Sequence, residues 1–392
     1  MRLRIKRRLG LSSTEVFTWI KSDQELAQVC ELWSGAAMLA LDTEFVRTET
    51  FHAYLGLIQV CLAEQSWLID PLTISDWQPF AAILVNPAIV KVFHSMSEDA
   101  EVLKHSVGVT IVNVFDTQIA AGFLGYPVQM SYAKLVEGLF DHVLPKEATR
   151  SDWLKRPLDD QQCEYAAADV YWLYQAYEIF AVQLRAQQRY DWVIEDCQRQ
   201  VDSYSPVAPA DYYLKLRGGW KLKGSRLQAL KDLAAWREVL AQASNYNRGR
   251  ILADKELIII AEKMPTNRTQ LQQALPLPAR KIRLYGDEVI QLVKQAEATR
   301  RQDYPVLIDG PLPADQADLL KTIRHHLAEL AELHNLPVEL LARRKALEMW
   351  LRSGSLDGQY RLPEALSGWR RDILVDSVSA LINAQWELPN ES

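Results

Sequence analysis

The segment from Ala37 to Phe45 constrains the fold more than any other part of the sequence, because it is an apolar run that ends in two carboxylates, Asp42 and Glu44. A strand of this composition is buried on both faces of a sheet. Residues i and i+2 of a strand point to the same side, so Asp42 and Glu44 should project together from its carboxyl end. One such pair is about as frequent as chance supplies in a chain of 392 residues, so its meaning depends on other carboxylates further along.

Two later segments place further acids where they can join this pair. An apolar strand expected over residues 89–93 leads into a helix, for which Ser97 is the predicted N-cap and Asp99 lies in the first turn. Tyr165 and Asp169 are four residues apart in a long helix-forming segment, a spacing that places them on one face. The candidate site therefore has five members: Asp42, Glu44, Asp99, Tyr165 and Asp169.

Each of these features also has an ordinary structural explanation when it is taken alone. The helix dipole favours an acid such as Asp99 in a first turn. Tyr165 and Asp169 can form a surface pair, and His94, just before the helix, is expected to pack or to support the site rather than bind a metal. The order of the segments and their flanking residues favours a shared site.

The remaining pattern predicts a mixed α/β domain followed by two helical blocks. Strands are expected over residues 57–62 and 66–70 and a helix near 77–84, which gives an early antiparallel meander and then α/β layering. Residues 117–189 are mainly helical, and the Pro- and Ser-rich residues 203–209 form a linker. Beyond the linker, helix-sized segments are predicted at 225–243, 254–262, 266–274 and 286–300, and, after a Pro/Gly break at 304–313, at 314–335, 337–342, 344–353 and 368–385.

Three motifs give the chain a specific resemblance to a known family. They are LDTEFVRTETF around Asp42, FHSMSEDAEVL around Asp99, and SDWLKRPL followed by CEYAAADV around Asp169. In order, spacing and flanking residues the chain resembles ribonuclease D of the DEDD exonuclease superfamily, from about Phe17 to Ile382. The resemblance implies a ribonuclease H-like mixed-sheet exonuclease domain over residues 1–205, with a basic extension at 1–12, and two all-α HRDC domains over 206–302 and 303–392.

The resemblance also implies a role for each site residue. Asp42 is expected to bridge two metal ions, Glu44 and Asp169 to hold the ion on the side of the nucleophile, and Asp99 to hold the other, partly through water. Oxygen ligands without His or Cys favour a hard ion, Mg²⁺ or Mn²⁺, and two such ions can stabilise both the attacking and the leaving oxygen at phosphorus. Tyr165 is expected to orient the attacking water. Glu164 stands where a sister branch has histidine, so the chain has the DEDDy pattern.

The function implied by the resemblance is that of a 3′→5′ exoribonuclease, which trims 3′ trailing nucleotides of tRNA precursors and releases 5′-mononucleotides. Two alternatives remain open. One is a DNA 3′→5′ exonuclease, because the carboxylate motifs do not distinguish ribose from deoxyribose. The other is a non-catalytic RNA-binding or helicase-associated protein whose helical blocks are the working part. The intact carboxylates and Tyr165 argue against the second alternative.

Three groups of residues are candidates for contact with RNA. The first group is Trp236, Arg237, Asn247 and Arg248, and the second is the cluster from Lys215 to Arg226. The third is the loop over residues 144–157, a possible guide for phosphates, which carries Lys146, Arg150, Lys155 and Arg156. A packed core residue or a solvated surface is the ordinary alternative for each group.

The overall composition neither supports nor excludes nucleic-acid binding. A net charge of −6 and a pI near 5.8 are not typical of a general nucleic-acid binder, but a few clustered cations are enough for a nuclease. Four scattered cysteines predict neither a zinc site nor disulfides, and no apolar run approaches the roughly 20 residues of a membrane span. We therefore expect a cytoplasmic monomer without membrane contact. The basic segment Met1–Arg8 lacks the apolar part of a secretory signal and is interpreted as a disordered arm, an RNA contact or the product of an upstream start codon.

Overall fold

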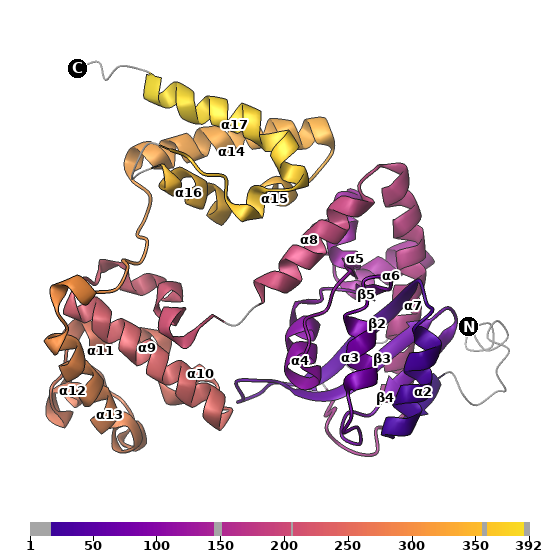
Figure 1. Cartoon of the computed structure of the whole chain (residues 1–392), viewed down its shortest axis with the longest axis horizontal. Coiled ribbons are helices and arrows are strands. Elements are labelled where there is room, and N and C mark those ends of the chain that lie inside the picture. Colours follow the sequence, from indigo (N-terminus) through magenta and orange to yellow (C-terminus); the bar gives the residue numbers. More distant parts are fainter. Residues whose placement is uncertain (1–16, 145–150, 205–206, 355–358, 388–392) are drawn as a thin grey trace. The chain divides into compact units, whose positions relative to one another are not determined.

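The first part of the chain is an α/β domain built on a six-stranded mixed sheet (Figure 1). The computed structural model describes residues 17–144, 151–204, 207–354 and 359–387. Across the sheet, the strands are β1 (Phe17–Ile20), β4 (Gln65–Ile69), β3 (Tyr54–Leu62), β2 (Met38–Val46), β5 (Val90–Phe93) and β6 (Val114–Asp116). β2 pairs antiparallel with β3 and parallel with β5. The strand that carries Asp42 and Glu44 therefore lies inside the sheet, as its apolar composition predicts.

The early meander is also confirmed, since β2, β3 and β4 follow one another in antiparallel order. Between β3 and β4 the chain turns at Ala63, which has a left-handed φ of 56°. β6 corresponds to no predicted strand, because three residues are too few to show an alternating pattern.

One long helix, α7, fixes the third motif against the sheet. The helices of the α/β domain are α2 (Asp23–Trp33), α3 (Gln78–Leu84), α4 (Ser97–Val107), α5 (Thr117–Phe123), α6 (Tyr132–Phe140), α7 (Asp160–Ala186) and α8 (Tyr190–Ser203). α7 packs against β2, β3 and β4. Its fully buried Ala166 and Ala167 have small side chains that allow close approach to the strands. The hydroxyl of Ser66 on β4 donates to the carbonyl of Ala167 at 3.1 Å, which ties the helix to the sheet.

The start of α4 corrects the predicted N-cap. Ser97 is the first helical residue, and the cap position belongs to Met96, which supplies no side-chain hydrogen bond. The buried carboxylate of Asp116 replaces the cap, because it accepts from the backbone N–H groups of Ser95 and Met96, both at 2.9 Å. It also accepts from the N–H of Gln118 at 2.7 Å and so caps α5. The cap of α4 comes from a distant segment, so the residues around Ser97 do not reveal it.

Residues 205–311, together with 47–53, form a separate compact unit. Its elements are η1 (Pro209–Lys215), η2 (Arg217–Lys221), α9 (Ser225–Ser244), α10 (Arg248–Ile251), α11 (Asp254–Lys263), α12 (Arg268–Ala274), α13 (Ala279–Ala298) and η3 (Arg301–Asp303). The unit has its own apolar core, centred on buried leucines of α9 such as Leu230 and Leu233. α13 begins at Ala279 and not at the predicted Gly286, because this glycine lies within the helix, with Leu271 close by.

The last helical block belongs to the same compact unit as the α/β domain. It consists of α14 (Ala314–His334), α15 (Val338–Leu341), α16 (Arg344–Ser353), η4 (Glu364–Leu366) and α17 (Trp369–Glu387). Arg370 binds both carboxylate oxygens of Asp196 on α8, at 2.5 and 2.6 Å. The ring of Trp369 stacks on that of Trp192, with 4.8 Å between centroids and 11° between planes. These contacts attach the block to α8.

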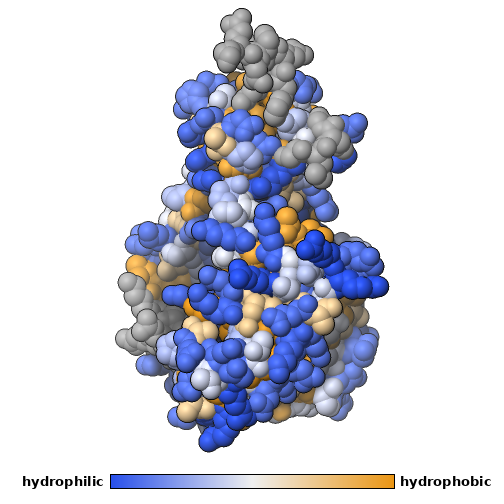
Figure 2. Space-filling model, turned by 90° about the vertical axis from the view of Figure 1, so that its left-hand side faces the viewer, coloured by the Kyte–Doolittle hydropathy of each residue, from blue (hydrophilic) through white to orange (hydrophobic). Residues whose placement is uncertain are grey.

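The surface in Figure 2 is mostly hydrophilic, with hydrophobic residues in small, scattered groups. Among the helices of the described residues, none combines the length and the apolar composition that a membrane span requires. The N-terminal residues Met1–Arg8, which are rich in arginine and lysine, lie outside the described residues.

Candidate active site

Three carboxylates from two distant segments meet at the end of β2. Asp42 and Glu44 come from the strand and Asp169 from α7. One carboxylate oxygen of each residue lies within 4.8 Å of those of the other two. The register of β2 against β3 shifts between Glu44 and Phe45, directly after the second acid. Such a bulge ends regular pairing and redirects side chains, which fits its place beside the cluster.

Asp99 lies near this cluster and is held by a residue of β2. It is a buried residue in the first turn of α4, and the hydroxyl of Thr43 donates to its Oδ1 at 2.5 Å. Thr43 stands between Asp42 and Glu44 in the sequence, so β2 carries two of the acids and also holds a third, Asp99. The charge of Asp99 also acts on Asp42 and Glu44. All four predicted acids therefore share one electrostatic environment, although the three-oxygen cluster itself does not include Asp99.

Two tyrosines lie next to Asp169. Tyr165 is one helical turn earlier on α7, and its hydroxyl interacts with the Asp169 carboxylate. Tyr132 on α6 donates its hydroxyl proton to the backbone carbonyl of Asp169. No pattern in the sequence identified Tyr132 or Asp116 as part of the site, because each acts through contacts made in the folded protein. His94 hydrogen-bonds through one ring nitrogen to Thr117 and through the other to the carbonyl of Met130, at 2.9 and 3.1 Å, which makes it a packed residue.

Burial raises the pKa of every carboxylate in the site, and repulsion by neighbouring acids of the site raises the pKa values of Asp42 and Glu44 further. Burial, followed by the charges of Asp99, Asp169 and Glu44, raises the pKa of Asp42 well above its ordinary value. Burial and the charges of Asp169 and Asp99 raise the pKa of Glu44 to about 8. Burial raises the pKa values of Asp99 and Asp169 to about 7. Four such acids ionise together only if cations neutralise them.

The donor set fits a hard divalent cation. Every donor is a carboxylate oxygen, the ligand type of Mg²⁺ and Mn²⁺. Oδ1 of Asp169 is buried and has no hydrogen-bond partner in the described part of the chain. A buried acceptor left in this state is unfavourable, and a bound cation would satisfy it.

In the cationic loop before α7, one of the four predicted cations, Arg156, is engaged in an ion pair within the protein. Arg156 binds both carboxylate oxygens of the buried Asp70, at 2.6 and 2.7 Å, and donates to the carbonyl of Gly56 at 2.7 Å. Its charge therefore holds the loop to the sheet. Lys155 is exposed, and Lys146 and Arg150 lie outside the described residues.

The first group of predicted RNA contacts is also engaged within the protein. Arg237 is fully buried and binds Asp254 and the carbonyl of Leu252. Arg248 pairs with Glu238 at 2.7 Å, and the Trp236 indole donates to Glu288, also at 2.7 Å. The side chain of Asn247 caps α10. These residues stabilise the helical unit, whereas the cations of the second predicted group, Lys215 to Arg226, are exposed.

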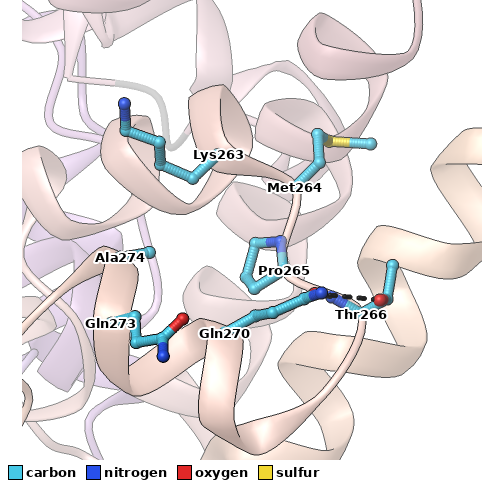
Figure 3. Close-up of a pocket in the computed structure, with 7 residues that line it drawn as sticks. All are labelled: Lys263, Met264, Pro265, Thr266, Gln270, Gln273 and Ala274. Atoms are coloured by element: carbon cyan, nitrogen blue, oxygen red, sulfur yellow. Dashed lines mark hydrogen bonds between the residues drawn. The ribbon is translucent and has the colours of Figure 1, made fainter.

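A pocket of about 490 Å³ lies between the end of α11 and α12, far in sequence from the acidic motifs (Figure 3). Lys263, Met264 and Pro265 line one part of it. Gln270 lies along another part and accepts hydrogen bonds from the N–H and hydroxyl of Thr266, at 2.8 and 2.9 Å. The pocket contains no carboxylate and no cluster of titratable groups, so it does not compete with the acidic site.

Comparisons with known proteins agree with this geometry. Residues 17–185 match the 3′-5′ exonuclease family, residues 226–293 the HRDC domain, and residues 317–378 the C-terminal HRDC domain of ribonuclease D. The chain is 40% identical to ribonuclease D of Pseudomonas paraeruginosa, over 93% of this chain and 96% of that one. It is 34% identical to ribonuclease D of Escherichia coli, over 93% and 98% of the two chains.

A solved structure gives the same result for the fold. The crystal structure of Escherichia coli RNase D, described as an exoribonuclease involved in structured RNA processing, matches with a TM-score of 0.89 at 33% identity. The match covers 94% of this chain and 99% of the other. The predicted exonuclease domain followed by two HRDC domains is thereby confirmed. The chain belongs to the ribonuclease D family.

Proposed function

We propose that this chain is a 3′→5′ exoribonuclease whose chemistry is carried by Asp42, Glu44, Asp99, Tyr165 and Asp169. The observation that carries the proposal is the meeting of three carboxylates within 4.8 Å, with Asp99 and Tyr165 beside them, in a member of an exonuclease family. These residues come from segments far apart in the sequence. A purely structural role explains each of them alone, but it does not explain four acids gathered at one place with raised pKa values.

Two ions of the Mg²⁺ or Mn²⁺ kind, held by the four acids, would neutralise charge at the scissile phosphate and activate a water molecule. The residues of the chain supply the positioning. Thr43 holds Asp99, and Tyr132 holds the backbone at Asp169. Burial raises the pKa of Tyr165, so its hydroxyl keeps its proton and can orient a water molecule. The product of each cycle is a 5′-mononucleotide.

The family suggests the biological substrate and the setting. We propose that the enzyme trims 3′ trailing nucleotides of tRNA precursors, as a monomer in the cytoplasm. We propose a three-part organisation, with the exonuclease domain at 1–205 and HRDC domains at 206–302 and 303–392. The family matches over 17–185, 226–293 and 317–378 fall inside these three parts and support the division.

Incubation of a 3′-extended tRNA precursor with Mg²⁺ tests the proposal. The wild type should shorten the RNA stepwise, and a chelator should stop the reaction. Asp42→Asn should lower the rate by about 10³-fold, as expected for loss of a group that stabilises the transition state electrostatically. Glu31→Gln, on the exposed face of α2, is the matched control and should retain full activity.

Oligomers of matched sequence in RNA and DNA decide between the two nuclease functions. Faster degradation of the DNA strand would replace the exoribonuclease by a DNA exonuclease. Failure to release nucleotides from any 3′-hydroxyl end would leave only a binding function.

A further inference from the structure

The stretch that leads into α9 and includes its first turns carries an unusual concentration of positive charge. Between Tyr212 and Lys231 there is no acidic residue, whereas the chain as a whole has a net charge of −6. Five of the cations in this stretch are exposed, and we call them, together with Trp220, the basic segment: Lys215, Arg217, Lys221, Lys223 and Arg226.

The cations of the basic segment are not neutralised within the unit. In the described part of the chain, none of the five forms an ion pair, although other basic side chains of the same unit do. Arg237 pairs with Asp254, Arg268 with Asp287, and Arg300 with Asp303, at 2.6–3.0 Å. Concentrating unpaired like charges is unfavourable by itself, so these positions are suited to an external anion.

The segment presents these cations from a fixed backbone. η1 and η2 pack onto the core of the unit through Tyr213, Leu216 and Leu222, and the cations between these residues are exposed. Gly219 lies so close to α9 that an added Cβ would clash with a methyl carbon of Leu230. The hydroxyl of Tyr213 donates to the carbonyl of Val306 at 3.0 Å and adds a second anchor. A surface fixed in this way does not have to be ordered when a ligand binds.

Trp220 adds an aromatic surface among the cations. The backbone of Gly310 lies against its ring, since a Cβ at that glycine would come within 2.8 Å of the indole. The side chain remains 39% exposed, and the ammonium group of Lys221 lies 5.3 Å from the ring centroid. An exposed aromatic ring beside cations is the combination that proteins use to bind single-stranded nucleic acid, with bases stacked on the ring and phosphates on the cations.

We propose that the basic segment is an RNA-binding surface of this enzyme, with Trp220 stacking a base and the five cations contacting phosphates. The inference rests on the proposed function, which supplies RNA as the polyanion. It assigns RNA contact to residues just before and at the first position of the matched HRDC region, which begins at residue 226. Arg237 and Arg248, inside that region, are engaged in ion pairs within the unit.

The test compares two variants with the same loss of charge. The segment variant replaces Lys215, Arg217, Lys221 and Lys223 by Gln. The control variant replaces four exposed cations that are already ion-paired, Arg268, Arg300, Lys321 and Arg344, by Gln. Binding of a fluorescent structured RNA with a single-stranded 3′ tail is measured in EDTA by anisotropy at several salt concentrations.

The segment variant should bind at least tenfold more weakly, and its salt slope should fall by about 3, because each lost phosphate contact removes about 0.7–0.9 from it. The control variant should keep the affinity and the salt slope of the wild type. Trp220→Ala should weaken binding by about tenfold without changing the salt slope, and Trp220→Phe should restore most of the loss. Equal affinity of the segment variant and the control would overturn the proposal.

A tetranucleotide separates this inference from the proposed function. The segment variant should hydrolyse it at the wild-type rate, because four nucleotides are few enough to be held by the active site alone. On the long RNA, the same variant should show a raised KM with an unchanged kcat. A wild type that hydrolyses neither RNA would contradict the proposed function. If the segment variant had wild-type kinetics on the long RNA, RNA binding by the basic segment would be contradicted, but the proposed function would not.

Discussion

At the scale of single residues, Thr43 connects two of the motifs. Its side chain lies on β2 between the two acids of the first motif and donates to Asp99 of the second. Thr43→Val keeps the shape of the side chain but removes this donor. We expect a loss of about tenfold or more in kcat/KM, the range for groups that orient metal ligands, and a higher Mg²⁺ concentration for half-maximal activity.

Thr110→Val, at a threonine outside the site, controls for the change in chemistry. Its activity and its Mg²⁺ dependence should equal those of the wild type. Unchanged Mg²⁺ dependence in Thr43→Val would show that Asp99 is held by other contacts.

The hydroxyl of Tyr165 should act as a positioning group that keeps its proton. Burial and the charges of Asp169 and Glu44 raise the pKa of Tyr165 above its ordinary value. Tyr165→Phe should therefore lower kcat by about 10²-fold with little change in KM. The wild-type pH–rate profile should show no transition near the ordinary tyrosine pKa of about 10. A transition there that disappears in Tyr165→Phe would instead identify the tyrosine as a base.

The raised carboxylate pKa values predict how the stability of the metal-free protein depends on pH. Folding raises the pKa of Glu44 from 4.5 to about 8, so the folded protein favours the protonated form. The stabilisation is complete below pH 4.5 and is lost as the pH rises through about 8. Glu44→Gln cannot ionise. Its free energy of unfolding relative to the wild type should therefore rise with pH across this window, by about 2 kcal/mol or more.

Urea unfolding at a series of pH values in EDTA measures this difference. Saturating Mg²⁺ should stabilise the wild type at pH 8. It should remove most of the difference in free energy of unfolding between the wild type and Glu44→Gln. A pH-independent difference between the two proteins would mean that Glu44 is solvated.

At the scale of elements, Asp116 connects the ends of two helices that surround the site. It is 1% exposed and accepts from the N–H groups of Ser95, Met96 and Gln118. Asp116→Ala leaves these donors unsatisfied and should lower the free energy of unfolding by about 2–4 kcal/mol. Because α4 carries Asp99, kcat should fall as well. Ser22→Ala, at the exposed N-cap of α2, should cost about 1 kcal/mol and leave kcat unchanged.

The helices and strands around the site show which features the sequence can predict and which it cannot. The apolar run of β2 and the spacing of Tyr165 and Asp169 are local patterns, and the structure brings these residues together as expected. The cap of α4 and the contact of Tyr132 with α7 join residues from different segments, so no local pattern contains them. For Arg156, sequence alone cannot tell a phosphate guide from an ion-pair partner, because Asp70 lies far away along the chain.

At the scale of the whole molecule, a buried ion pair joins the last helical block to α8. The side chains of Arg370 and Asp196 are 10% and 9% exposed. Arg370→Met leaves the Asp196 charge buried without its partner and should destabilise the protein by about 3–5 kcal/mol. Arg371→Met, at the exposed neighbouring residue, should have little effect.

A double-mutant cycle with Asp196→Asn separates the coupling of the pair from the cost of burying one charge. Urea unfolding and limited proteolysis near residue 312, where the chain re-enters this compact unit, measure the result. Additive effects of the two substitutions would show that stacking of Trp369 on Trp192 holds the block without help from the ion pair.

The raised pKa values of the acids in the metal-free site link cation uptake to the acidity of the surroundings. Near neutral pH, a substantial fraction of these groups hold hydrogen ions that must leave before the carboxylates can act as ligands. Uptake of the metal is therefore an exchange of protons for cations, and calorimetry in buffers of different ionisation enthalpy would count the protons released. A mildly acidic environment and a shortage of divalent ions would both inactivate the enzyme by leaving the acids protonated and without metal, with no change in the fold.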